Sequence, residues 1–172
     1  CPTRERHGWT GDAQIFFGTA AYLFDYASFS KKFLNDMYDW QRKDGCLPQI
    51  APAGGVYFYM NTMNGSVGWA DAGVIIPYRF WKQYGDERIL TQYYSGMKKY
   101  ARFMMKRCGK LGLLAKPLGL HGENRKYAVN AGQSYGEWAE PAVVHPNKWT
   151  DMAAPHPEVS TAYTTYVMSL MA

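Results

Sequence analysis

The sequence predicts an all-α domain built from an inner and an outer layer of helices. Segments that are apolar on nearly every side alternate along the chain with segments that are apolar on one face only. Such alternation is expected where inner helices contact neighbours all round and outer helices leave one face in water. Long stretches rich in Gly and Pro separate these segments and predict irregular loops.

The first two helices are predicted over residues 13–24 and 28–41. Thr10 is expected to cap the first helix, with Asp12 in its first turn, where a carboxylate interacts favourably with the helix dipole. Because residues 13–24 are nearly all apolar or small, this helix is expected to be buried on most sides. The second helix is amphipathic, and its apolar stripe consists of Phe29, Phe33, Met37 and Trp40.

A Gly-, Pro- and Asn-rich loop follows at 45–66, in which 56–60 has the composition of a short strand. A second apolar helix is predicted from about 69 to 84, with a kink at Pro77 because proline removes a helical hydrogen bond. Gly85 and Asp86 then interrupt the helical pattern. Trp81 falls at helical spacing and is assigned to the core, as is Trp40.

A further amphipathic helix is predicted up to Cys108, with Gly109 as its stop. Its basic side chains lie off the apolar stripe. Residues 109–156 show little periodicity, and such long irregular stretches in compact domains are usually functional or poorly ordered. Pro157 opens a last apolar helix. The apolar stripe of the amphipathic helix that ends at Cys108 consists of Leu90, Tyr94, Met97, Ala101, Met104 and Cys108.

Composition excludes several classes of protein. With 47% hydrophobic and 19% charged residues among 172, the chain is not disordered and can form one core. Its net charge is +5, but Lys and Arg are spread over helix surfaces, so a nucleic-acid partner is not expected. The three Cys and four His show no metal-ligand spacing, and no metal or cofactor is expected. No apolar run reaches the ~18 residues of a membrane span, and no compartment is indicated.

The first residues concentrate acid, base and aromatic groups directly before an apolar helix: Cys1-Pro-Thr-Arg-Glu-Arg-His-Gly-Trp-Thr-Gly-Asp-Ala-Gln. Two carboxylates, Glu5 and Asp12, stand seven residues apart. Loops held by rigid elements are frequent sites of catalysis. An ordinary capped loop, in which Glu5 pairs with Arg4 or Arg6 at the surface, fits the same residue types.

This stretch resembles the signature of the inverting α-L-rhamnosidases of glycoside hydrolase family 78. Weaker matches follow: Gly-Trp-Ala-Asp at 68–71, Tyr-Gly-Asp at 84–86 and Tyr-Gly-Glu-Trp at 135–138. The resemblance implies an (α/α)6 barrel, to which the chain would contribute about five of twelve helices. Residues 1–172 would then be a single incomplete catalytic domain, truncated at both ends.

The resemblance also implies roles for individual residues. Glu5 would be the general acid, with a pKa raised by burial or by neighbouring Asp12. Arg4, Trp9 and Asp12 would line the rhamnose pocket. Trp69 suits the face and methyl group of a 6-deoxy sugar, and Asp71 is either a sugar ligand or a first-turn helix carboxylate. Glu137 and Trp138, in the long loop, are expected at the pocket.

The sequence departs from the family pattern at three places. The Asp that usually precedes Cys-Pro is absent because the chain starts at Cys1, and Gln49 stands where an acidic residue is common. The general base is expected beyond residue 172, so this chain alone should be inactive. Its expected partners are rhamnosides and a second copy bound through exposed inner-helix surfaces. Another helical-barrel glycosidase or lyase, or a non-catalytic glycan-binding or assembly module, remains as an alternative.

Overall fold

The computed structural model describes residues 3–4, 6–53, 61–112, 123–136 and 156–172, and these are α-helical apart from loops, turns and isolated β-bridges. The predicted all-α class is confirmed. The strand expected at 56–60 lies outside the described residues. The elements are α1 (Thr10–Leu23), α2 (Ala27–Asp39), α4 (Ala72–Tyr84), α5 (Arg88–Met105), the 3-10 helix η1 (Glu123–Tyr127) and α7 (Pro157–Met171).

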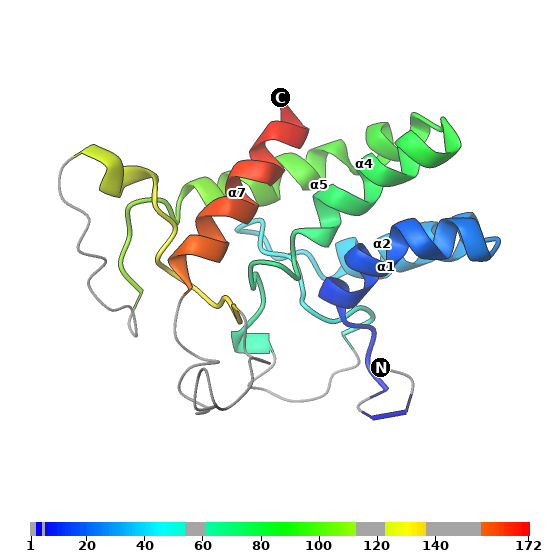
Figure 1. Ribbon diagram of the computed structural model, residues 1–172, viewed down its shortest axis with the longest axis horizontal. Coiled ribbons are helices and arrows are strands. Elements are labelled where there is room, and N and C mark those ends of the chain that lie inside the picture. The colour runs from blue at the N-terminus through cyan, green and yellow to red at the C-terminus, as the bar shows by residue number, and fades with distance from the viewer. Residues whose placement is uncertain (1–2, 5, 54–60, 113–122, 137–155) are drawn as a thin grey trace.

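Helix α4 is the centre of the described structure, since it contacts α1, α2, α5 and α7 (Figure 1). Helices α1 and α7 flank it within one layer, while α2 and α5 contact each other and α4 from the other layer. The order inner, outer, inner, outer, inner therefore matches the alternation in the sequence. In Figure 1 the described loop residues 40–53 and 61–71 lie toward the side where α1 and α7 begin, while the short turns between α1 and α2 and between α4 and α5 lie at the opposite end.

The three inner helices differ in burial. In α4 every residue of 72–77 is buried, as is Phe80, because this helix has neighbours on both sides. Helix α7 buries only Ser160, Thr164 and Val167. The prediction that the first helix is buried on most sides is wrong: α1 exposes apolar side chains on the face away from the core, namely Ile15, Phe16, Tyr22 and Leu23. Self-association through this face stays a prediction.

The outer helices α2 and α5 are amphipathic, as predicted, but two details of the prediction are wrong. Trp40 is 48% exposed, so its assignment to the core is wrong; it stands at the C-cap of α2, where the chain leaves the layer. Trp81 does pack against the core. On α5 the predicted stripe is rotated by one residue in its first half, since Tyr94 is 50% exposed. The observed stripe is Ile89, Tyr93, Met97, Tyr100, Ala101 and Met104.

Helix ends follow the sequence only in part. Gly85 ends α4 with φ +67° and donates its N–H to the Trp81 carbonyl at 2.8 Å, and Pro77 lies inside the helix. Thr10 is not the cap: it is the first residue of α1, and its hydroxyl donates to a main-chain carbonyl of a distant loop. Gly109 has φ +74° but follows Met105 by four residues, so it does not stop α5.

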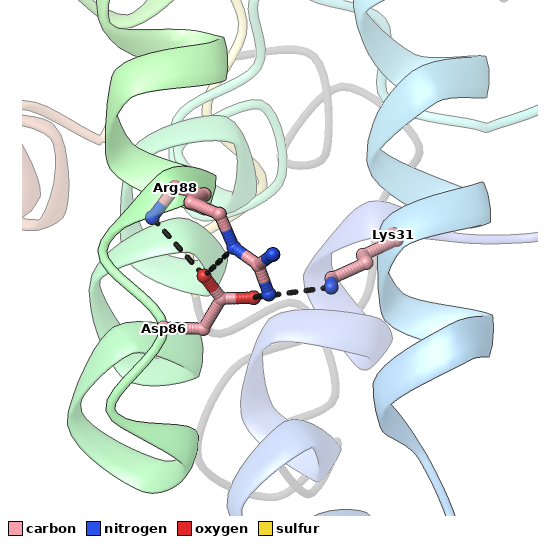
Figure 2. A network of polar contacts seen from close by, with 3 residues as sticks. All are labelled: Lys31, Asp86 and Arg88. Atoms are coloured by element: carbon pink, nitrogen blue, oxygen red, sulfur yellow. Dashed lines mark hydrogen bonds and ion pairs between the residues drawn. The ribbon is translucent and has the colours of Figure 1, made fainter.

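An exposed ionic network joins the outer layer to the turn after α4 (Figure 2). Asp86 accepts hydrogen bonds from Lys31 of α2 at 3.2 Å and from the Arg88 guanidinium at 2.7 and 2.9 Å. The hydrogen bonds from Arg88 hold the pKa of Asp86 well below its usual range. This network fixes the turn between α4 and α5 against α2.

Candidate functional site

A groove of about 920 Å³ opens where α1 and α7 begin and where the chain enters α4. Three of the predicted site residues, Trp9, Asp12 and Trp69, line it together. The lining continues along α1 and α2 and across to α7, through His7, Gly8, Gly11, Ala13, Ile15, Phe16, Thr19, Tyr26, Phe29, Phe33, Val67, Gly68, Gly136, Val159 and Tyr163.

The first wall of the groove, residues 7–13, is held by main-chain hydrogen bonds to residues 49–51. Trp9 forms an antiparallel bridge with Ile50, and the Gly8 carbonyl accepts the N–H of Ala51 at 2.9 Å. A Cβ on Gly8 would stand 2.1 Å from the Ala51 carbonyl oxygen. Only glycine therefore allows the two segments to approach this closely.

Asp12 lies in the first turn of α1 and is exposed to solvent. The partial positive charge at the start of a helix favours a carboxylate there. Among the described residues that line the groove, Asp12 is the one carboxylate. It can accept hydrogen bonds from hydroxyl groups of a ligand in the groove.

The second wall, residues 67–69, is held by one main-chain bond, from the Val67 N–H to the Gln133 carbonyl at 3.0 Å, and otherwise by side chains. The Gly68 N–H donates to Asp71 at 2.6 Å, and the Gly68 carbonyl accepts the side-chain amide of Gln14. The centroids of the Trp69 and Tyr135 rings lie 4.5 Å apart. Trp69 also lies so close to Gly11 that a Cβ added to Gly11 would stand 2.9 Å from the indole. The two walls thus meet at the contact between Trp69 and the start of α1.

Asp71 supports this wall from behind. It is fully buried at the N-cap position of α4, not in the first turn, and accepts the Tyr100 hydroxyl at 2.9 Å besides the Gly68 N–H. Burial raises the pKa of Asp71 to about 6, while the hydrogen bonds from Gly68 and Tyr100 and the charge of Arg107 act in the opposite direction. Its contacts are internal, and a role as sugar ligand stays a prediction.

Of the remaining predicted residues, the structure describes Arg4 alone. Arg4 lies in an exposed turn at 3–4 and does not line the groove. Glu5, Glu137 and Trp138 lie outside the described residues. Sequence reasoning missed Tyr163, which lies in α7 and lines the groove, because the sequence pattern indicates only an apolar helix there. The one available signal is a tyrosine in the second turn of an otherwise apolar helix. Tyr163 lies near the N-terminal end of α7, as Asp12 lies near the N-terminal end of α1.

Neither a metal centre nor a membrane segment emerges from the described part of the chain. No group of three or more His, Cys, Asp or Glu within 3–4, 6–53, 61–112, 123–136 and 156–172 could hold a metal ion. Over the same ranges, no helix is both long and apolar enough to cross a bilayer.

Comparison with known proteins decides the family. All of residues 1–172 match the sequence model of the bacterial alpha-L-rhamnosidase six-hairpin glycosidase domain. The chain belongs to this family. Six helical hairpins form an (α/α)6 barrel, and the alternating inner and outer helices of this rhamnosidase-family chain are part of that architecture.

Individual relatives agree. The alpha-L-rhamnosidase of Streptomyces avermitilis is 40% identical over 102 residues, which cover 59% of this chain and 9% of the relative. The crystal structure of the Streptomyces avermitilis alpha-L-rhamnosidase complexed with L-rhamnose matches with TM-score 0.69 and 31% identity over 97% of this chain and 13% of that one. The alpha-L-rhamnosidase structure from Dictyoglumus thermophilum gives TM-score 0.70 and 28% identity, over 98% and 16%. This family member thus spans a small part of its relatives' length.

Proposed function

We propose that the protein hydrolyses terminal α-L-rhamnosides with inversion, with Glu5 as general acid. The observation that carries the proposal is the match of all 172 residues to the rhamnosidase domain family. The family match extends over the motif that contains Glu5, Trp9 and Asp12. We also propose that residues 1–172 belong to one barrel domain.

The groove supports this proposal because its chemistry suits a 6-deoxy sugar. Trp9 and Trp69 offer aromatic faces on two walls, and Asp12 offers a hydrogen-bond acceptor in the same groove. Aromatic rings pack against the C–H face and methyl group of a sugar, while a carboxylate accepts its hydroxyl hydrogens. A relative from Streptomyces avermitilis has been solved with L-rhamnose bound.

The proposed reaction breaks the bond between the anomeric carbon and the leaving oxygen in one displacement. Glu5 donates its proton to the leaving oxygen, and a water molecule attacks the opposite face while losing a proton to a carboxylate base. Acid and base stand ~6.5–9.5 Å apart in inverting enzymes to make room for that water. Asp12 is proposed to assist by keeping Glu5 protonated, and the base is expected outside the described residues.

The test compares the full-length natural protein with its Glu5→Gln variant on two α-L-rhamnosides, one with a nitrophenol leaving group and one with an alkyl alcohol. The alkyl leaving group depends more on protonation, so the variant should lose about 10³-fold in kcat there and less on the nitrophenyl substrate. Proton NMR should detect the β-anomer of rhamnose first. Glu123→Gln is the matched control, since Glu123 is an exposed carboxylate of η1.

Three results would contradict parts of this proposal. Equal turnover by the Glu5→Gln variant on both substrates would move the acid to another residue. Faster hydrolysis of another sugar would assign a different barrel glycosidase. Tight rhamnoside binding without turnover in the wild-type protein would indicate a non-catalytic glycan-binding module.

A further inference from the structure

Gln49 hydrogen-bonds to the first wall of the groove and to Tyr135, which contacts the second wall. It is fully buried, although it lies in a loop between α2 and α4. Its main-chain carbonyl accepts both the N–H and the hydroxyl of Thr10, each at 3.0 Å. Thr10 directly follows Trp9, so this part of Gln49 fixes the first wall.

The side chain of Gln49 reaches two residues that contact Trp69 of the second wall. Its Oε1 accepts the Tyr135 hydroxyl at 2.6 Å and lies 3.3 Å from the Ser66 hydroxyl. The Tyr135 ring contacts the Trp69 ring, and the Ser66 carbonyl accepts the N–H of Trp69 at 3.2 Å. The Gln49 side chain therefore holds Tyr135 and lies against Ser66, and both of these residues contact Trp69.

From this geometry we propose that Gln49 is a positioning residue that sets the distance between Trp9 and Trp69, and so the fit of the sugar between them. Its main chain fixes one tryptophan wall and its side-chain oxygen tethers the other. A buried amide oxygen that loses its donor, or a buried hydroxyl that loses its acceptor, must find another partner or move. The fit to the sugar rests on the proposed function; the tether itself does not.

Two variants break the tether from opposite ends in the full-length protein. Gln49→Leu removes the acceptor, and Tyr135→Phe removes the donor while leaving Gln49 and its main chain intact. Each should raise the KM for a nitrophenyl α-L-rhamnoside about tenfold and change kcat by less than about threefold, because substrate fit and not proton transfer is altered. The double variant should be no worse than Gln49→Leu by more than about twofold, because Gln49→Leu already removes the acceptor that Tyr135 uses.

The matched control is Tyr93→Phe. Its hydroxyl also donates to a side-chain amide oxygen, that of Asn35, at 2.5 Å, but it joins α5 to α2 away from the groove. If lost stability alone raised KM, this variant would raise KM as well. We expect KM unchanged in Tyr93→Phe.

A readout independent of activity completes the test. Fluorine NMR of the protein labelled with 5-fluorotryptophan, with the Trp69 signal assigned by Trp69→Phe, should show that signal shifted in both tether variants and unmoved in Tyr93→Phe. An unmoved Trp69 signal in Tyr135→Phe and Gln49→Leu would overturn the proposal whatever the kinetics. A shifted signal in a protein that turns over no rhamnoside would keep the tether and remove the proposed substrate instead.

Discussion

The two walls of the groove differ in the interactions that hold their tryptophans. The first wall, which carries Trp9, is bonded through main-chain groups to residues 49–51. The second wall has one main-chain bond to a distant segment, from the Val67 N–H to the Gln133 carbonyl, but around Gly68 and Trp69 it depends on the side chains of Asp71, Gln14 and Tyr135. Main-chain bonds survive most substitutions, whereas a side-chain support disappears with one. Point changes should therefore displace Trp69 far more readily than Trp9, unless they act on the main chain itself.

Gly8→Ala should have the largest effect, because it disrupts the main-chain contact that holds the first wall. The added Cβ would stand 2.1 Å from the Ala51 carbonyl oxygen, so the two segments must separate. We expect a loss of about 3 kcal/mol in stability and a large loss of rhamnoside turnover. Thermal denaturation and kinetics measure both effects.

The matched control for Gly8→Ala is Gly18→Ala in α1, where an added Cβ meets no atom within 4 Å. This substitution should stabilise the protein by up to about 1 kcal/mol, because alanine favours the helix. A Gly8→Ala variant as stable and active as wild type would show that the first wall tolerates separation, and the contrast between the walls would fail.

The second wall should respond to pH through Asp71. Burial raises the pKa of Asp71 from 3.8 to about 6, so the folded protein holds this proton more tightly than the unfolded chain does. The resulting stability is fully present below about pH 4 and is lost as the pH rises through 6. Asp71→Asn cannot titrate, so wild type should lose up to about 3 kcal/mol relative to this variant between pH 4 and pH 7.

Chemical denaturation of both proteins at several pH values measures this difference, since other titrating groups cancel between them. Parallel stability profiles for wild type and Asp71→Asn would mean that Asp71 keeps an ordinary pKa inside the protein. The fluorine signal of Trp69 should follow the same transition near pH 6 in wild type only, because Asp71 accepts the N–H of Gly68 beside it.

The sequence predicted most of the fold because helix period and composition are local properties. It identified α2, α4, α5 and α7 and the alternation of layers, but it placed Trp40 in the core and rotated the stripe of α5. Which side of a helix is buried depends on neighbours far along the chain. The exposed apolar face of α1 shows this most clearly, because no described helix covers it.

The candidate site was predictable only where its residues belong to a recognisable sequence motif. Trp9, Asp12 and Trp69 were expected at the site and do line one groove. The support of that groove was not predictable: Gln49 entered only as a departure from a pattern, and Asp71 as either a sugar ligand or a helix-end carboxylate. Their partners Tyr135 and Tyr100 lie 86 and 29 residues away in the chain, so no local signal connects them.

Asp86→Asn should have the smallest effect and sets the baseline for the comparison. Asp86 is bound by Lys31 and Arg88 on the surface, remote from both walls. Because its pKa is lowered, the stability it contributes is present at neutral pH and is lost as the pH falls below about 4, opposite in sign to Asp71. We expect a slight drop in Tm at pH 7 that vanishes in about 1 M salt, which screens exposed charges. The Trp69 signal and the rhamnoside KM should not move; a shift in either would mean that the groove responds to stability in general and not to the supports of its second wall.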